Sequence, residues 1–110
     1  MVLTPVPQAD GTVKNRPAIV LREMPVYRDV LVCGVSTQLH QYVPGFDDLI
    51  STADADFAES GLVAPSLIRL GFLAVVPRRT IPGTIGAIAP ERHKRLLQAL
   101  SNYLLRNLGS

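Results

Sequence analysis

The residues of this chain best suited to chemistry are one arginine and a pair of hydroxyl side chains. Arg16 opens an apolar, β-like run over residues 16–21, and Ser36 and Thr37 follow a second apolar run over residues 30–35. A guanidinium group stays protonated and offers planar, paired hydrogen bonds to a phosphate. Hydroxyls at a strand end can bond a phosphate oxygen or stabilise developing charge. We therefore expect two neighbouring strands to hold a phosphodiester between these side chains.

On pattern alone, each of these residues also fits a role without chemistry. Arg16 fits an exposed arginine at a strand start, and the hydroxyl pair fits a strand cap or turn. His40 and His93 can each act as an acid or base near neutral pH, and each also fits a solvated side chain. Of the two, His40 is the better candidate, because it lies only three residues after Thr37.

Composition bounds the class of protein. The chain has 110 residues, of which 47% are hydrophobic, so we expect a single domain over residues 1–110 with a packed core. Charged residues make up only 18%, below the roughly 25% of an average domain, which favours a surface covered by a partner. A chain this small leaves much apolar surface near water, so a dimer is also expected.

The location expected for the protein is the cytoplasm. Cys33 is the only cysteine, which excludes an internal disulfide and fits a reducing compartment; we expect it to be a buried strand residue. No apolar run approaches the ~20 residues of a membrane span. The first residues lack the basic and apolar regions of a signal peptide.

Charge is distributed unevenly along the chain. Residues 1–28 carry four basic and two acidic side chains, residues 29–68 carry six acidic and no basic ones, and residues 69–110 carry seven basic and one acidic. Folding into one basic and one acidic face would attract a phosphate backbone to the basic face. The same residues also fit ordinary solvated surfaces without a ligand.

No metal or other cofactor is expected. No group of His, Cys and Asp residues has the spacing of metal ligands. The acidic pairs at residues 47–48 and at Asp54 and Asp56 lack the further ligands and the glycine of a calcium loop. We interpret them as parts of a solvated acidic loop.

The elements that must position the candidate residues are short strands. Apolar runs and turn residues predict strands at residues 2–6, 17–23, 30–35, 46–51, 65–76 and 84–88. Gly71 in the longest of these predicts a bulge or sharp bend. Pro90 starts an amphipathic helix whose apolar positions include Leu96 and Leu100. The fold class is therefore mainly β with a C-terminal helix, as a small bent barrel plugged by that helix.

The chain resembles the MazF/PemK family, the toxins of type II toxin–antitoxin systems. Five segments match family motifs in order: residues 2–7 (VLTPVP), the Asp10-Gly11 turn with residues 15–21 (NRPAIVL), residues 32–37 (VCGVST), residues 60–66 (SGLVAPS) and residues 85–91 (IGAIAPE). The resemblance implies a small SH3-like barrel with a C-terminal helix that assembles as a homodimer. It also implies a cognate antitoxin protein as a partner.

The activity that the resemblance implies is metal-independent cleavage of single-stranded mRNA. A ribose 2′-hydroxyl attacks the neighbouring phosphate and leaves a cyclic phosphate and a free 5′-hydroxyl. By position, Arg16 would stabilise the reacting phosphate, Ser36 would take the role of the family's Thr or Ser, and Thr37 would support it. Candidate RNA-binding residues are Asp10, Lys14, His40, Arg69, Arg78 and Arg79.

A second hypothesis is a non-catalytic, SH3-like family member that binds an antitoxin, another protein or nucleic acid without cutting. Members usually begin with a Gly-Asp pair before the first strand, which this sequence lacks. Some also place an acid five residues before the arginine, where this chain has Gly11.

Overall fold

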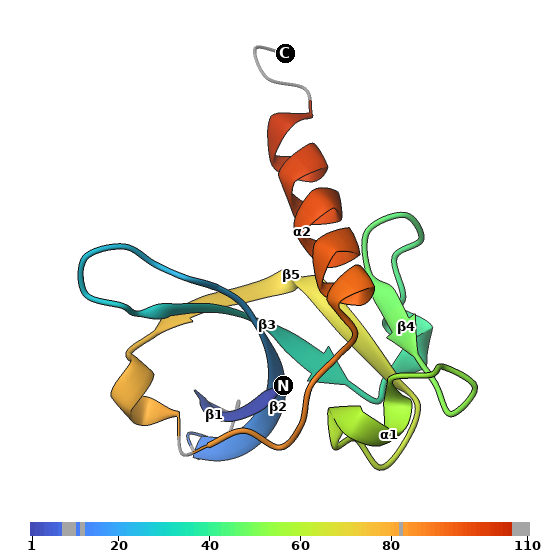
Figure 1. The fold of residues 1–110 in the computed structure, drawn as a ribbon, viewed down its shortest axis with the longest axis horizontal. Coiled ribbons are helices and arrows are strands. Elements are labelled where there is room, and N and C mark those ends of the chain that lie inside the picture. The colour runs from blue at the N-terminus through green and yellow to red at the C-terminus, as the bar shows by residue number, and fades with distance from the viewer. Residues whose placement is uncertain (8–10, 12, 82, 107–110) are drawn as a thin grey trace.

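A single antiparallel sheet dominates the protein, with a helix at its C-terminal end (Figure 1). The computed structural model describes residues 1–7, 11, 13–81 and 83–106. Its strands are β1 (Val2–Pro7), β2 (Val13–Glu23), β3 (Val30–Ser36), β4 (Asp48–Ile50) and β5 (Ser66–Val76), in the order β1-β2-β3-β5-β4. The helices are α1 (Phe57–Ser60) and α2 (Pro90–Leu105), with short 3-10 turns η1 (Leu39–Gln41) and η2 (Arg78–Thr80). The predicted fold class, mainly β with a C-terminal helix, is confirmed.

β2 begins four residues earlier than predicted. Its first part, from Val13 to Pro17, pairs with β1, whereas pairing with β3 starts only at Ala18, which lies opposite Gly34. A proline has no N–H to donate, so it is tolerated where a strand has a paired neighbour on one side only. Arg16 therefore lies inside β2, in the part of this strand that pairs with β1 but not with β3.

The predicted bend in the long strand β5 is present. Arg69 lies opposite Gly34 of β3, and Leu73 lies opposite the adjacent residue Cys33. The three residues of β5 between them, 70–72, therefore have no partner in β3. This bulge contains Gly71 and re-aims the side chains that follow it.

The predicted strand at residues 84–88 is wrong. Thr84 forms a single bridge with Val2, and the backbone N–H groups of Ile85 and Ala87 donate to Met1 and Glu59, at 3.1 and 2.8 Å. Because these bonds reach two different segments, no continuous ladder forms. The close packing of this segment against the end of α1 also explains two glycines, since a Cβ on Gly61 would collide with the carbonyl of Ile85 and one on Gly86 with the backbone of residues 59–60.

The main core lies between the sheet and the first half of α2. Its buried members come from β2, β3, β4, β5 and α2, and include Ile19, Leu21, Cys33, Ile50, Ile68, Leu70, Leu96 and Leu100. Cys33 is buried in a strand, as expected. The second half of α2 extends away from the sheet, and its Leu104 and Leu105 are exposed (Figure 1). Among the described residues, no helix is long and apolar enough to cross a membrane.

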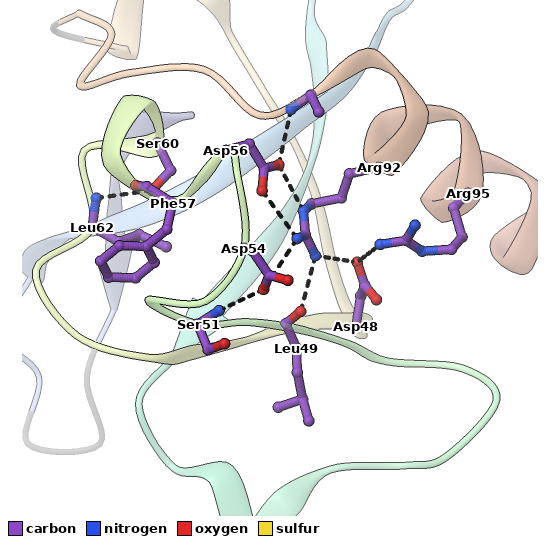
Figure 2. Close-up of polar contacts among 11 residues, drawn as sticks. Asp48, Leu49, Ser51, Asp54, Asp56, Phe57, Ser60, Leu62, Arg92 and Arg95 are labelled. Atoms are coloured by element: carbon purple, nitrogen blue, oxygen red, sulfur yellow. Dashed lines mark hydrogen bonds and ion pairs between the residues drawn. The ribbon is translucent and has the colours of Figure 1, made fainter.

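The acidic segment is not a solvated loop, contrary to our interpretation. Asp47 and Asp56 are each only 8% exposed. Asp47 accepts hydrogen bonds from the backbone N–H groups of Val43 and Leu70, at 3.1 and 3.2 Å. Asp56 accepts from Arg92, a buried arginine of α2 (Figure 2). These carboxylates are buried because they satisfy donors that the fold would otherwise leave unpaired.

His93, the second histidine that we considered as an acid or base, instead connects two elements of the fold. Its Nε2 atom lies 3.1 Å from the backbone carbonyl oxygens of both Val20 and Leu21, so the ring joins α2 to β2. His93 is not among the residues that line the candidate site described below. The alternative of a solvated histidine is not observed either, because the side chain is half-buried.

Candidate phosphate-binding site

The register of the sheet places the predicted site residues on one face. Ala18, Gly34 and Arg69 lie side by side across β2, β3 and β5. Side chains two residues apart in a strand point to the same face. Arg16 precedes Ala18 by two residues and Ser36 follows Gly34 by two, so both share the face of Arg69. This face is opposite to that of Ile19 and Cys33, which belong to the main core.

The same residues line one pocket of about 640 Å³. Arg16, Ser36, Thr37 and Arg69 are all part of its wall. Ala18 and Gly34 line it as well. Apolar residues complete the wall: Val35, Leu62, Val63, Phe72, Leu73 and Ile85 are among them.

The electrostatic character of the pocket favours an anion. It contains two guanidinium groups, those of Arg16 and Arg69, and none of the described residues that line it is acidic. Arg16 is exposed and Arg69 is half-buried. A concave surface lined by charge of one sign concentrates the field and attracts the opposite charge.

Ser36 holds the turn that leaves β3. Its Oγ accepts a hydrogen bond from the backbone N–H of Gln38 at 3.0 Å. Ser36 therefore does have the turn role that the sequence also allowed. As the acceptor of this bond, the hydroxyl uses a lone pair and not its proton. The hydroxyl proton is still able to donate to a phosphate oxygen in the pocket.

The structure does not bring every predicted RNA-binding residue to this pocket. His40 lies on η1 and is exposed, and Arg78 and Arg79 lie on η2. None of these three lines the pocket, and Arg78 donates to Glu23 at 2.6 Å. Asp10 and the side chain of Lys14 lie outside the described part of the protein.

Phe72 is a pocket residue that the sequence analysis did not single out. It follows Gly71, where we predicted a bulge or bend without assigning a role to the next side chain. The signal that marks it is the bulge itself, because a bulge turns a neighbouring side chain out of the regular alternation.

Comparison with known proteins identifies the family. The model for the PemK-like, MazF-like toxin of type II toxin–antitoxin systems matches residues 1–104. The fold is similar to that of the solved Mycobacterium tuberculosis toxin MazF-mt6, with a TM-score of 0.64, 20% sequence identity, and coverage of 94% of this chain and 96% of that one. Among curated proteins, no match was found. Because the family model spans nearly the whole sequence, this chain belongs to the PemK-like, MazF-like toxins of type II toxin–antitoxin systems.

Proposed function

We propose that the protein is a metal-independent endoribonuclease that cleaves single-stranded mRNA, and that Arg16, Ser36 and Thr37 form its catalytic site. The observation that carries the proposal is the pocket in which these three side chains meet Arg69. Membership of the toxin family supports the same reading. With mRNA as the substrate, the protein would act in the cytoplasm.

The reaction that we propose is a transesterification. The oxygen of a ribose 2′-hydroxyl forms a bond to the adjacent phosphorus, and the bond from phosphorus to the 5′-oxygen of the next nucleotide breaks. The 2′-hydroxyl loses one proton and the 5′-oxygen gains one. The products are a 2′,3′-cyclic phosphate and a free 5′-hydroxyl.

The pocket residues would act on the charge that develops at phosphorus. Arg16 would donate from its guanidinium to the phosphate oxygens, and Ser36 would donate its hydroxyl proton to one of them. Thr37 would support Ser36 at the end of β3. An arginine is a poor proton donor, so its role in this scheme is charge stabilisation and not acid catalysis.

Two protein partners belong to the proposal. We expect a cognate antitoxin that covers the pocket, and a second copy of this chain. Large apolar side chains are exposed at the turn between β2 and β3 and on the second half of β5; they include Val26, Tyr27 and Val75. Exposed apolar area of this kind marks protein interaction surfaces.

The test is cleavage of a mixed-sequence RNA in the presence of EDTA, with analysis of the product ends. We expect Arg16→Ala and Ser36→Ala to slow cleavage by about 100-fold or more, as when a preorganised donor is removed from an active site. Arg22→Ala is the matched control, since Arg22 is an exposed arginine of the same strand outside the pocket.

Two outcomes would contradict the proposal. If the Arg16→Ala protein cuts as fast as the Arg22→Ala protein, Arg16 is not catalytic. If the parent protein binds RNA or an antitoxin but leaves every RNA intact, the non-catalytic hypothesis is correct. A DNA strand of the same sequence, which lacks the 2′-hydroxyl, must remain uncut in either case.

A further inference from the structure

The ring of Phe72 lies over the backbone of Gly34 on the pocket side of the sheet. A Cβ built on Gly34 would be 2.7 Å from Cδ1 of Phe72 and 3.3 Å from its Cγ. The Cβ direction of Gly34 is shared with its neighbours Ala18 and Arg69 across the sheet, because residues opposite one another point to the same face. The bulge in β5 therefore delivers the aromatic ring to the face that carries Arg16 and Ser36.

This ring is packed on one side and open on the other. Phe72 is 47% exposed, and Leu73 and Val75 of the same half of β5 are exposed as well. The missing side chain at position 34 lets the ring lie close to the strand beneath it. Phe72 lines the same pocket as the guanidinium groups of Arg16 and Arg69 and the hydroxyls of Ser36 and Thr37.

Phe72 is also the only aromatic residue at the pocket. The chain has six aromatic residues, all within the described part, and Phe72 alone lines it. Tyr27 is 84% exposed at the turn after β2. Phe46 packs against Tyr103 of α2, with the ring centroids 4.8 Å apart.

We propose that Phe72 is the stacking platform for one base of the RNA, next to the phosphate held by Arg16 and Ser36. The inference rests on the proposed function in that it takes single-stranded RNA as the ligand. Aromatic side chains stack on bases of any type, while cationic side chains hold the backbone. A base on Phe72 would fix the register of the strand, so that one particular phosphate lies against Arg16.

The first test uses fluorescence. The chain contains no tryptophan, so Phe72→Trp introduces a single indole at the proposed platform. The probe is a 2′-O-methyl oligoribonucleotide of mixed sequence, which binds as RNA but cannot undergo 2′-hydroxyl attack. We expect this oligonucleotide to quench the indole, and an otherwise identical abasic oligonucleotide to quench it much less. Tyr27→Trp is the control outside the pocket, and its emission should not change.

The second test measures affinity for the same oligonucleotide. Phe72→Leu keeps an apolar side chain but removes the aromatic ring, and we expect it to weaken binding by about 5- to 100-fold. Phe72→Tyr keeps the ring and should bind as the parent does. Gly34→Ala should weaken binding as well, because its Cβ displaces the ring. Thermal melting of each variant shows that it is folded.

The outcomes separate this inference from the proposed activity. Stacking is supported, and cleavage rejected, if binding depends on Phe72 while natural RNA is never cut. Stacking is rejected, and cleavage retained, if Phe72→Leu binds and cuts RNA as the parent does. The inference would also be overturned if the emission of the Phe72→Trp protein does not change with RNA but changes with protein concentration. That result would mean that a second copy of the chain covers the ring.

Discussion

Arg92 and Asp56 join the C-terminal helix to the loop before α1 through a pair of parallel hydrogen bonds. Nε and Nη2 of Arg92 donate to Oδ2 and Oδ1 of Asp56, at 2.8 and 3.0 Å. The same guanidinium lies within ion-pair distance of Asp48 and Asp54, and it donates to the carbonyl of Leu49 at 2.9 Å (Figure 2). Asp56 also accepts from the backbone N–H of Ala89, directly before α2. One buried cation thus organises three carboxylates and the start of a helix.

Removing that cation should strongly destabilise the fold. We expect Arg92→Met to lower the free energy of unfolding by about 3–5 kcal/mol, because it leaves the buried carboxylate of Asp56 without its cationic partner. Arg95→Met is the control: Arg95 also binds Asp48, but its side chain is 57% exposed, so its loss should cost at most about 1 kcal/mol. Urea unfolding measures both. Equal costs for the two variants would show that burial of Arg92 does not matter.

The same pair predicts how stability depends on pH. The Arg92 guanidinium lowers the pKa of Asp56 from 3.8 to about 2. A carboxyl with a lowered pKa in the folded state stabilises the fold fully above its unfolded pKa. That stabilisation, about 2 kcal/mol here, is lost as the pH falls from about 4 through about 2. We expect Asp56→Asn to flatten the fall in unfolding free energy over this range. An unchanged slope in the variant would assign the acid sensitivity to other groups.

A close backbone contact at Gly86 gives a separate prediction. A Cβ at this position would collide with backbone atoms of residues 59–60, which cannot move as a side chain can. We expect Gly86→Ala to destabilise the protein by about 1–3 kcal/mol, the usual cost of overpacking. Gly83→Ala is the matched control in the same segment, since a Cβ there would meet nothing within 4 Å. A melting temperature equally unaffected in both variants would disprove the close contact.

The elements of this protein that could be predicted from the sequence are those marked by a local pattern of apolar residues or by residues typical of a helix end. The apolar run of β3 and the Pro90 start of α2 follow from periodicity and from helix-end preferences. The segment at residues 84–88 also has strand-like composition, but its backbone bonds reach Met1 and Glu59, and this depends on tertiary contacts. Arg92 was missed for the same reason, although its spacing of four residues before Leu96 places it on the buried face of the helix.

The candidate site was predicted only in part, because the position of Phe72 depends on how β5 pairs with β3. Arg16 and Ser36 were identified as candidates from the sequence, and both line the pocket, although Arg16 lies inside β2 and not at its start. Phe72 reaches the same pocket only because three residues of β5 are unpaired. The length of a bulge depends on both strands together, so it cannot be read from either one alone.

Cys33 should be unreactive in the folded protein. Its thiol is fully buried, and burial raises its pKa to about 12, so almost no thiolate is present near neutral pH. We expect a thiol reagent at pH 8 to label the protein only after urea is added. Rapid labelling of the native protein, at the rate of a small-molecule thiol, would mean that the strand opens or that the pocket gives access to the sulfur.

The salt dependence of RNA binding should identify which arginines contact phosphates. Each phosphate neutralised on a single strand contributes about 0.7 to the slope of log affinity against log salt concentration. Arg69 lines the pocket and Arg79 does not, although both were predicted to bind RNA. We therefore expect Arg69→Gln to weaken binding and reduce the slope by about 0.7, and Arg79→Gln to change neither. The measurement is a salt titration of binding to a 2′-O-methyl oligoribonucleotide. If Arg79→Gln reduces the slope and Arg69→Gln does not, the RNA backbone follows the basic turn η2 and not the pocket.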